Sequence, residues 1–203
     1  MRIVYLIAGQ GERDAIAAPL SVVDYKIEHF QDVQSFLARP ALDPAACLLV
    51  DLESVDDGVM ARLRALREPL PIILLSSHAN VPLAVKAMKE GAADVLQKPA
   101  PPERLLGAVS AALEESRARV ERAQRQKDVL ARFRSLSARE RDVVDAVLDG
   151  HGNREVASQL GIKLRTVEIH RSHAMTKLGA RTLADLVRIR LDVDGATARL
   201  SAE

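Results

Sequence analysis

The sequence predicts a doubly wound α/β domain with a five-stranded parallel sheet, joined by a long helix to an all-α domain of four helices. Short apolar runs alternate with helical segments over residues 1–110, and residues 111–135 form a charged stretch without proline or glycine. Residues 136–203 show helical periodicity alone. Continuous apolar strands that alternate with helices are typical of a parallel sheet covered on both faces. We therefore expect three parts: the α/β domain, a helical linker and the all-α domain.

Strands and helices of the first domain follow one another in order along the chain. The predicted strands are residues 3–8, 25–30, 47–50, 71–75 and 94–97. The predicted helices are residues 12–20, stopped by Pro19, then 32–38 and 81–90, and a helix from Glu103 onward. In such a fold, ligands bind beyond the carboxyl ends of the strands. Asp51, Ser76 and Lys98 each follow a strand, so we expect them to meet at one edge of the sheet.

The composition excludes several classes of protein. Cys47 is the single cysteine, which rules out an internal disulfide framework and a clustered cysteine zinc site, and we expect a reducing, cytoplasmic compartment. We interpret Cys47 as a small buried hydrophobe. No apolar run approaches the roughly 20 residues of a membrane span, so we expect no membrane partner. With two Tyr, three Phe and no Trp, a stacking platform for single-stranded nucleic acid is disfavoured.

The formal net charge of +1 hides an uneven distribution of charge. Residues 1–110 hold 11 basic and 14 acidic side chains, whereas residues 154–181 hold 6 basic and 2 acidic ones. Charge asymmetry between segments indicates partners better than the total does. We therefore expect a mildly acidic first domain and a nucleic-acid-binding segment in the second.

The residues at the strand ends resemble a known domain. Asp51, Ser76 and Lys98 with Pro99, each after a strand, are similar to the receiver domain of two-component response regulators, a flavodoxin-like fold. Residues 78–92 resemble the FixJ subgroup of these regulators. The resemblance implies that Asp51 accepts a phosphoryl group from a histidine kinase, and that Ser76 and Lys98 line the receiver pocket.

Two parts of the receiver pattern are missing. The family's acidic pair after the first strand holds Mg²⁺, but Ala8-Gly9-Gln10 stands there, and Glu12 lies further on, where we expect it to be solvated. Val95 replaces the family's aromatic switch residue. Asp51 thus has two interpretations, a phospho-acceptor or a carboxylate ion-paired with Lys98. We favour a degenerate receiver that acts without aspartyl phosphorylation, and we expect no metal and no cofactor.

The linker also has two interpretations. The 4-3 spacing of a coiled-coil seam is followed by Val109, Leu113, Ser116, Val120, Ala123, Lys127 and Leu130. Ser116, Ala123 and Lys127 weaken such a seam, because the seam is normally apolar and bulky. A solvated helical linker explains the segment equally well.

The second domain begins with the capping box Ser137-Ala138-Arg139-Glu140, which opens an amphipathic helix that ends at Gly150. We expect Asn153 to cap the next helix, which Gly161 ends, and a third helix to start at Leu164. Two short helices joined by a tight turn that contains glycine are typical of a helix-turn-helix. The all-α domain is therefore predicted to contain this motif.

The third helix has one apolar and one polar face. At about 100° per residue, Val167, Ala174 and Leu178 form a buried stripe, opposite a polar face suited to base edges in the major groove. Flanking cations and hydroxyls are placed for phosphates, and Arg171 is expected to reach a phosphate or to pair with an acid such as Glu140. The candidate DNA-binding residues are Lys163, Arg165, Thr166, Glu168, Ile169, Arg171, Ser172, Thr176 and Lys177.

A second resemblance covers most of this domain. The LuxR-type DNA-binding domain of FixJ/NarL response regulators is similar to this chain over residues 136–143, 161–171 and 177–187. The resemblance implies that the third helix enters the major groove and that the fourth helix mediates dimerisation on DNA. The dimerisation residues it indicates are Leu183, Leu186 and Val187. Lys163 stands where the family has an N-capping serine, so we expect a weaker cap, and we expect residues 192–203 to be a frayed tail.

The sequence therefore predicts a transcriptional regulator that binds duplex promoter or operator DNA as a homodimer. We expect no enzyme, because no nucleophile–base pair, metal cluster or glycine-rich phosphate loop is present. Two alternatives stay open. One is a conventional regulator that a histidine kinase phosphorylates on Asp51, and the other is an interaction module that sequesters a protein partner.

Overall fold

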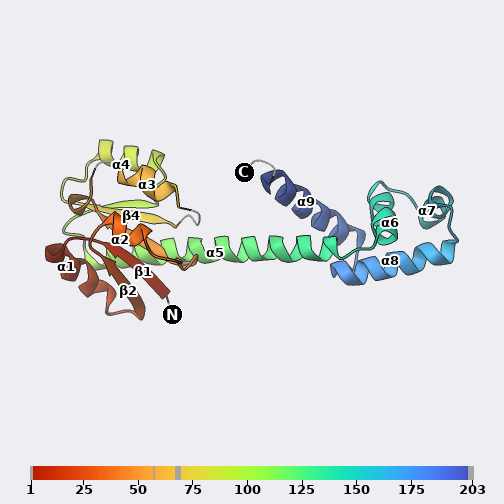
Figure 1. Ribbon diagram of the computed structural model, residues 1–203, viewed down its shortest axis with the longest axis horizontal. Helices are drawn as coiled ribbons and strands as arrows, with labels where there is room; N and C mark the ends of the chain where they lie inside the picture. The colour runs from red at the N-terminus through yellow and green to blue at the C-terminus, as the bar shows by residue number, and fades with distance from the viewer. Residues whose placement is uncertain (1, 57, 67–69, 201–203) are drawn as a thin grey trace. The chain divides into compact units, whose positions relative to one another are not determined.

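The computed structural model of the protein describes residues 2–56, 58–66 and 70–200 (Figure 1). The chain divides into two compact units, Met1–Glu121 and Arg122–Glu203, which we call the N-terminal unit and the C-terminal unit. The long helix α5, Pro102–Arg134, begins in the first unit and ends in the second. Within the described residues, no helix is long and apolar enough to cross a membrane.

A parallel sheet forms the centre of the N-terminal unit. Its strands are β1 (Arg2–Ile7), β2 (Tyr25–Phe30), β3 (Cys47–Asp51), β4 (Ile72–Ser76) and β5 (Asp94–Gln97). Their spatial order is β2-β1-β3-β4-β5, and every neighbouring pair is parallel. β3 and β4 are buried along their whole length, as their continuous apolar sequences predict. The predicted five-stranded, doubly wound sheet is confirmed.

Helices cover both faces of this sheet (Figure 1). The helices before α5 are α1 (Gln10–Leu20), α2 (Val33–Leu37), α3 (Val59–Arg64) and α4 (Val81–Lys89). α1 and the first half of α5 pack on one face, around a core that includes Leu6 and Leu49. α2, α3 and α4 pack on the other face, around Phe36, Leu48 and Leu74. Cys47 is fully buried, and burial raises the pKa of its thiol to about 12, as expected of a small buried hydrophobe.

Two helices differ from the sequence-based prediction. α1 begins at Gln10, two residues before the predicted start, and ends at Leu20 as predicted, with Pro19 inside its last turn. A proline in the last turn removes only its own hydrogen bond, and burial of Leu20 in the core holds this end of the helix. The prediction does not include α3, a helix of six residues that spans fewer than two helical turns.

The first half of α5 packs against its own sheet. Leu105, Val109 and Leu113 are buried in the core there. Ser116 is also fully buried, and its hydroxyl donates to the carbonyl oxygen of Ala46 at 2.7 Å. Three positions of the predicted 4-3 spacing therefore face this unit, and a partner helix has no access to them.

The C-terminal unit packs the end of α5 and four further helices of the described chain around one core (Figure 1). These helices are α6 (Ala138–Leu148), α7 (Asn153–Leu160), α8 (Leu164–Leu178) and α9 (Leu183–Leu200). The predicted capping box opens α6: the Glu140 amide donates to Ser137 Oγ at 3.2 Å, and the Ser137 amide donates to Glu140 Oε2 at 2.8 Å. The predicted all-α domain with a helix-turn-helix is confirmed.

Most of the predicted frayed tail is helical instead. α9 continues to Leu200, and residues 201–203 lie outside the described residues. Val193 is buried, and the Nε of Arg190 lies 3.1 Å from an oxygen of Asp194 one turn later. Burial and an ion pair at i,i+4 spacing both stabilise this part of the helix.

Candidate functional site: the sheet-edge pocket and helix α8

Asp51 and Lys98 form an ion pair at the carboxyl edge of the sheet. Asp51 ends β3 and is completely buried, and its Oδ1 lies 2.6 Å from Lys98 Nζ. Its Oδ2 accepts a hydrogen bond from Ser54 Oγ, which in turn accepts one from the Gly9 amide at 2.8 Å. Both carboxylate oxygens of Asp51 therefore have partners within the chain.

Glu53 is not among the predicted site residues, yet its carboxylate joins two of them. Its Oε2 lies 2.8 Å from Lys98 Nζ, and its Oε1 accepts from Ser76 Oγ at 2.8 Å and from the Ser77 amide at 2.7 Å. Because a hydroxyl has one hydrogen to donate, Ser76 donates to Glu53 rather than to Asp51. A carboxylate two residues after Asp51, at the same edge of a parallel sheet, is the sequence signal that could have indicated this contact.

The charges in this cluster stabilise one another. Burial would raise the pKa of Glu53, but hydrogen bonds from Lys98 and Ser76 hold the pKa of that carboxyl well below its usual range. Burial would lower the pKa of Lys98, but three neighbouring carboxylates raise it above its usual range. The third is Glu12, whose Oε2 lies 3.2 Å from Lys98 Nζ. Glu12 was expected to be solvated, and its side chain is about half exposed but paired.

The receiver fold implies a Mg²⁺ ion beside the phospho-acceptor, and the residues of this pocket do not fit one. Mg²⁺ is held by carboxylate oxygens in near-octahedral geometry. Ala8, Gly9 and Gln10 after β1 bring no carboxylate, and the Gly9 amide already binds Ser54. The cation that faces Asp51 is the Lys98 ammonium group. Across the residues that the structure describes, no group of three or more metal-ligating side chains is found.

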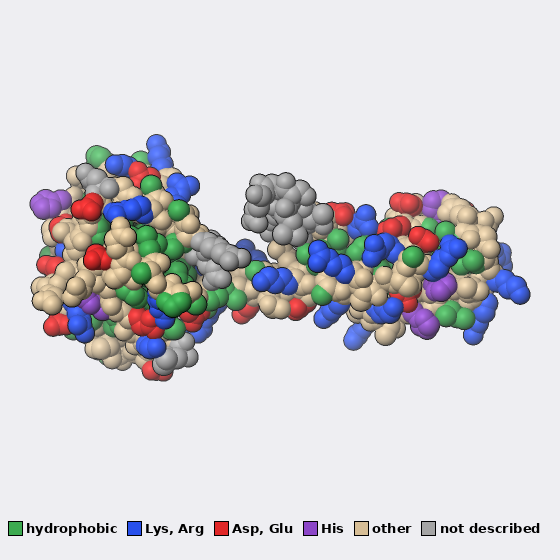
Figure 2. Space-filling model, viewed as in Figure 1, with side chains coloured by type: hydrophobic (Ala, Val, Ile, Leu, Met, Phe, Trp, Pro, Cys, Tyr) green, Lys and Arg blue, Asp and Glu red, His purple; other side chains and the backbone are tan. Residues whose placement is uncertain are grey.

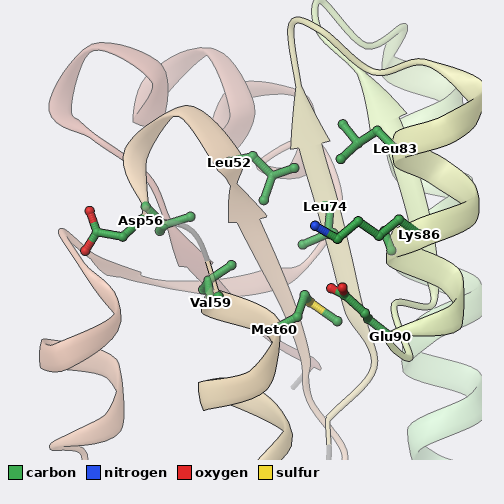
Figure 3. A pocket seen from close by; sticks show the side chains of 11 residues that line it. Leu52, Asp56, Val59, Met60, Leu74, Leu83, Lys86 and Glu90 are labelled. Atoms are coloured by element: carbon green, nitrogen blue, oxygen red, sulfur yellow. The ribbon is translucent and has the colours of Figure 1, made fainter.

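Two clefts lie near this edge. A cleft of about 140 Å³ between α3 and α4 is lined by side chains that include Leu52, Val55 and Lys86 (Figure 3). Leu52 and Val55 belong to the segment that carries Glu53, which begins with the short 3-10 helix η1, Leu52–Ser54. A second cleft of about 270 Å³ lies beside Lys98, against α1. The first cleft contains none of the predicted site residues, whereas the second contains Lys98 alone of them.

Helix α8 has the two faces that its periodicity predicts. Val167, Ala174 and Leu178 are buried in the core of the C-terminal unit. On the opposite side, the Arg165 side chain is 82% exposed, and its guanidinium lies 3.3 Å from Glu168 Oε2. On the face drawn in Figure 2, Lys and Arg side chains are spread over the C-terminal unit. This polar face of α8 therefore points away from the core of the C-terminal unit.

The N-terminal ends of α7 and α8 differ in one detail from the prediction. Lys163 stands at the capping position before α8 and its side chain makes no capping hydrogen bond, as predicted. Asn153, however, is the first residue of α7, and the capping position belongs to Gly152, whose amide donates to Glu155 Oε2 at 2.7 Å. The Asn153 side chain is not available for capping because its Oδ1 accepts from Arg171 at 2.6 Å. Arg171 thus links α8 to α7.

Lys177 has a second role besides the predicted phosphate contact. Its Nζ lies 2.6 Å from Glu140 Oε2 and within hydrogen-bond distance, 3.4 Å, of the Ser135 carbonyl oxygen. Glu140 is almost fully buried, and the hydrogen bonds from Lys177 and from the Ser137 amide lower the pKa of its carboxyl to about 2. Lys177 therefore neutralises a buried charge in its own domain.

An apolar stripe runs along α9. Leu183, Val187 and Leu191 lie four residues apart and are 47%, 43% and 66% exposed. Leu186, which the sequence places with Leu183 and Val187, is only 2% exposed and belongs to the core of its own unit. Leu186 is therefore out of reach of a partner, and Leu191 completes the exposed stripe.

Two family models match this chain. The response regulator receiver domain matches residues 10–110, and the luxR family of bacterial regulatory proteins matches residues 134–190. The chain is a response regulator of the FixJ/NarL family. Its N-terminal unit is a receiver domain and its C-terminal unit holds a LuxR-type DNA-binding domain, and we use these names from here on.

Relatives of this response regulator align with most of its length. It is 35% identical to the transcriptional regulatory protein FixJ of Bradyrhizobium diazoefficiens over 183 residues, which are 88% of this chain and 89% of that protein. It is 35% identical to the tetrathionate response regulatory protein TtrR of Salmonella typhimurium over 178 residues, 86% of this chain and 84% of that protein.

Solved structures of response regulators are similar to it as well. The response regulator StyR matches with a TM-score of 0.79 and 30% identity, over 93% of this chain and 97% of that one. Full-length FixJ from B. japonicum matches with a TM-score of 0.55 and 32% identity, over 95% and 97% of the two chains. Both likenesses support the arrangement of a receiver followed by a DNA-binding domain in this FixJ/NarL regulator.

Proposed function

We propose that this response regulator is a transcription factor that acts in the cytoplasm, binds duplex DNA as a homodimer, and has a receiver that works without aspartyl phosphorylation. One observation carries the proposal about the receiver. The group that faces Asp51 is the Lys98 ammonium at 2.6 Å, and the family's acidic pair is replaced by Ala8-Gly9-Gln10. Transfer of a phosphoryl group to Asp51 needs a metal ion to neutralise the developing charge. The acidic pair that would hold that ion is missing after β1, and the three carboxylates at this edge are paired with Lys98.

The DNA contact that we propose uses the exposed face of α8. Base edges in the major groove would meet Arg165, Glu168, Ile169, Ser172 and Thr176. Glu168 can accept from cytosine N4, and Ile169, which is 44% exposed, offers an apolar contact to a thymine methyl group. Lys163, Thr166, Arg171 and Lys177 lie at the flanks, where side chains contact phosphates. Arg171 and Lys177 keep intramolecular partners, so their contribution to phosphate binding is shared with the fold.

The dimer that we propose forms through α9. Leu183, Val187 and Leu191 form a continuous exposed apolar stripe. A stripe with this spacing can pack against the same stripe of a second copy about a two-fold axis. Dimeric regulators of this architecture place two recognition helices in successive major grooves.

The test is a binding measurement with the full chain. A duplex is selected from a random library, and binding is followed by fluorescence anisotropy at several salt concentrations. We expect sequence-specific binding, a changed preference for Glu168→Ala, and weaker binding to all sequences for Lys163→Ala. An unchanged preference for Glu168→Ala would contradict the docking of α8. The absence of specific binding would favour the alternative of an interaction module.

A further inference from the structure

The carboxylate of Glu53 lies where three hydrogen-bond donors converge. Lys98 Nζ is 2.8 Å from one of its oxygens, and Ser76 Oγ and the Ser77 amide are 2.8 Å and 2.7 Å from the other. An ammonium group, a hydroxyl and a backbone amide are the donors that an oxyanion needs. Both oxygens of Glu53 are thus engaged at a site built for an anion.

We propose that Glu53 is the resident anion of this receiver. Its carboxylate occupies the anion site formed by Lys98, Ser76 and the Ser77 amide, and holds the segment between β4 and α4 in a fixed conformation without any phosphoryl group. The inference rests on the proposed function, because it supplies the means by which the receiver is set without phosphorylation. The ligand that would replace Glu53 is a small oxyanion such as a carboxylate or phosphate.

The contacts on either side of Glu53 connect the anion site to its surroundings. Ser76 Oγ also accepts from the His78 amide at 3.1 Å, and Asn80 then caps α4 by accepting from the Leu83 amide at 2.9 Å. Ser76 and Ser77, which donate to Glu53, therefore stand only a few residues before the start of α4 at Val81. On the other side, Leu52 precedes Glu53 and Val55 follows it by two residues, and both line the cleft between α3 and α4. Figure 3 shows Leu52 in the wall of this cleft.

Exposure makes this anion site testable. The Glu53 side chain is 34% exposed, whereas the Lys98 side chain is 9% exposed. Removal of the Glu53 carboxylate would therefore leave a solvent-accessible space above donors that are themselves held in place. A small carboxylate in solution can enter such a space and restore the lost hydrogen bonds.

Glu53→Ala in the full chain tests the proposal, with Glu12→Ala as its matched control. Glu12 also pairs with Lys98, at 3.2 Å, whereas the Ser76 hydroxyl and the Ser77 amide both donate to Glu53. The amide resonances of Ser77 and His78 are followed by NMR in sodium acetate and in sodium chloride of equal ionic strength. We expect Glu53→Ala to move both resonances, and acetate to return them saturably towards the wild-type positions. Glu12→Ala should leave them in place.

Binding to DNA supplies the functional readout. We expect Glu53→Ala to weaken the affinity of the full chain for its selected duplex by about tenfold, within the usual size of a coupling between sites, and acetate to restore it. In the double variant Glu53→Ala with Ser76→Ala, acetate should have no effect. Where Glu53→Ala lowers the thermal stability of the receiver, Glu53→Ser serves instead, because its short polar side chain leaves the same space open to acetate and no carboxylate to pair with Lys98.

Three results would overturn the proposal. The first is that Glu53→Ala leaves the Ser77 amide resonance at its wild-type position. The second is that Glu53→Ala and Glu12→Ala shift the resonances equally. The third is that acetate restores neither the resonances nor the DNA affinity of a folded Glu53→Ala variant. Each of these leaves phosphorylation-independent DNA binding by the wild-type chain untouched. Phosphorylation of Asp51 in the wild-type chain, by contrast, would contradict the proposed function. It would not change the NMR result that shows whether Glu53 occupies the anion site.

Discussion

Lys177 Nζ lies 2.6 Å from Glu140 Oε2 and joins the C-terminal half of α8 to the capping box of α6. Glu140 satisfies the amide of Ser137 with the same oxygen, so one carboxylate serves both the start of α6 and the end of α8. Lys177 thus contributes to the fold as well as to the positive charge of the face that we propose for DNA binding. Arg171 shares this double role through its hydrogen bond to Asn153 of α7, but Lys177 is the cation of α8 that neutralises the buried Glu140 carboxylate.

Lys177→Ala and Lys163→Ala should therefore differ in their effect on stability. Lys177→Ala leaves the buried Glu140 carboxylate without its cation, so it should lower both the melting temperature of the DNA-binding domain and the DNA affinity. Lys163→Ala removes an exposed cation with no capping bond. It should leave the melting temperature unchanged and reduce the salt slope of DNA binding by about 1. Thermal unfolding by circular dichroism and anisotropy titrations check this, and equal melting temperatures for the two variants would contradict it.

The same ion pair predicts a pH dependence. The pKa of Glu140 is lowered from 4.5 to about 2 in the folded protein. The stability that its charged form contributes is therefore fully present above pH 4.5 and is lost as the pH falls towards 2. Glu140→Gln should lose this part of the dependence. Urea unfolding of both proteins across this range gives the difference in free energy of unfolding, which should shrink as the pH falls; a constant difference would contradict the pairing.

Two leucines of α9 should respond in opposite ways. Leu186 is 2% exposed in the core of the DNA-binding domain, so Leu186→Ala should cost about 2–5 kcal/mol of unfolding free energy. Leu191 is 66% exposed, so Leu191→Ala should leave stability nearly unchanged and weaken the dimer. Chemical unfolding measures the free energy of unfolding, and analytical ultracentrifugation of the protein bound to DNA measures dimerisation. If Leu186→Ala abolishes dimerisation and leaves stability unchanged, Leu186 belongs to the dimer interface, as the family resemblance indicates.

The pocket of the receiver predicts an order of stabilities. Lys98→Met leaves the fully buried Asp51 carboxylate with Ser54 alone, so it should cost about 3–5 kcal/mol. Asp51→Asn leaves Lys98 with Glu53 and Glu12, and should therefore cost less. Urea unfolding followed by circular dichroism gives both values. A larger cost for Asp51→Asn than for Lys98→Met would show that the ion pair is not the main stabiliser of this edge.

Strand patterns predict the location of the receiver pocket because parallel strands end at one edge of a sheet. Asp51 and Lys98 pair there, and Ser76 reaches Lys98 through Glu53. The 3.6-residue period likewise places Val167, Ala174 and Leu178 in the core. Glu53 is not predictable in this way. It lies in a single turn of 3-10 helix, where no periodicity fixes the direction of a side chain.

Partners across helices are a second limit of sequence reasoning. The helical angle places Lys177 near the DNA side, but its bond to Glu140 depends on the packing of α6 on α8, which are 37 positions apart in the chain at these residues. Leu186 and Leu191 show the same limit, since the boundary between core and exposed stripe on α9 depends on the helices beneath it. The periodicity of a sequence predicts which face of a helix is buried, but it does not predict which other helices that face contacts.

Intact mass spectrometry of the full chain, after incubation with acetyl phosphate and Mg²⁺, measures whether Asp51 accepts a phosphoryl group. Lys98 holds Asp51, Glu53 fills the anion site, and no carboxylate pair follows β1. We predict no phosphoryl adduct, together with specific DNA binding that is the same with and without the phosphodonor. An adduct of one phosphoryl group that disappears in Asp51→Asn and strengthens DNA binding would contradict the account.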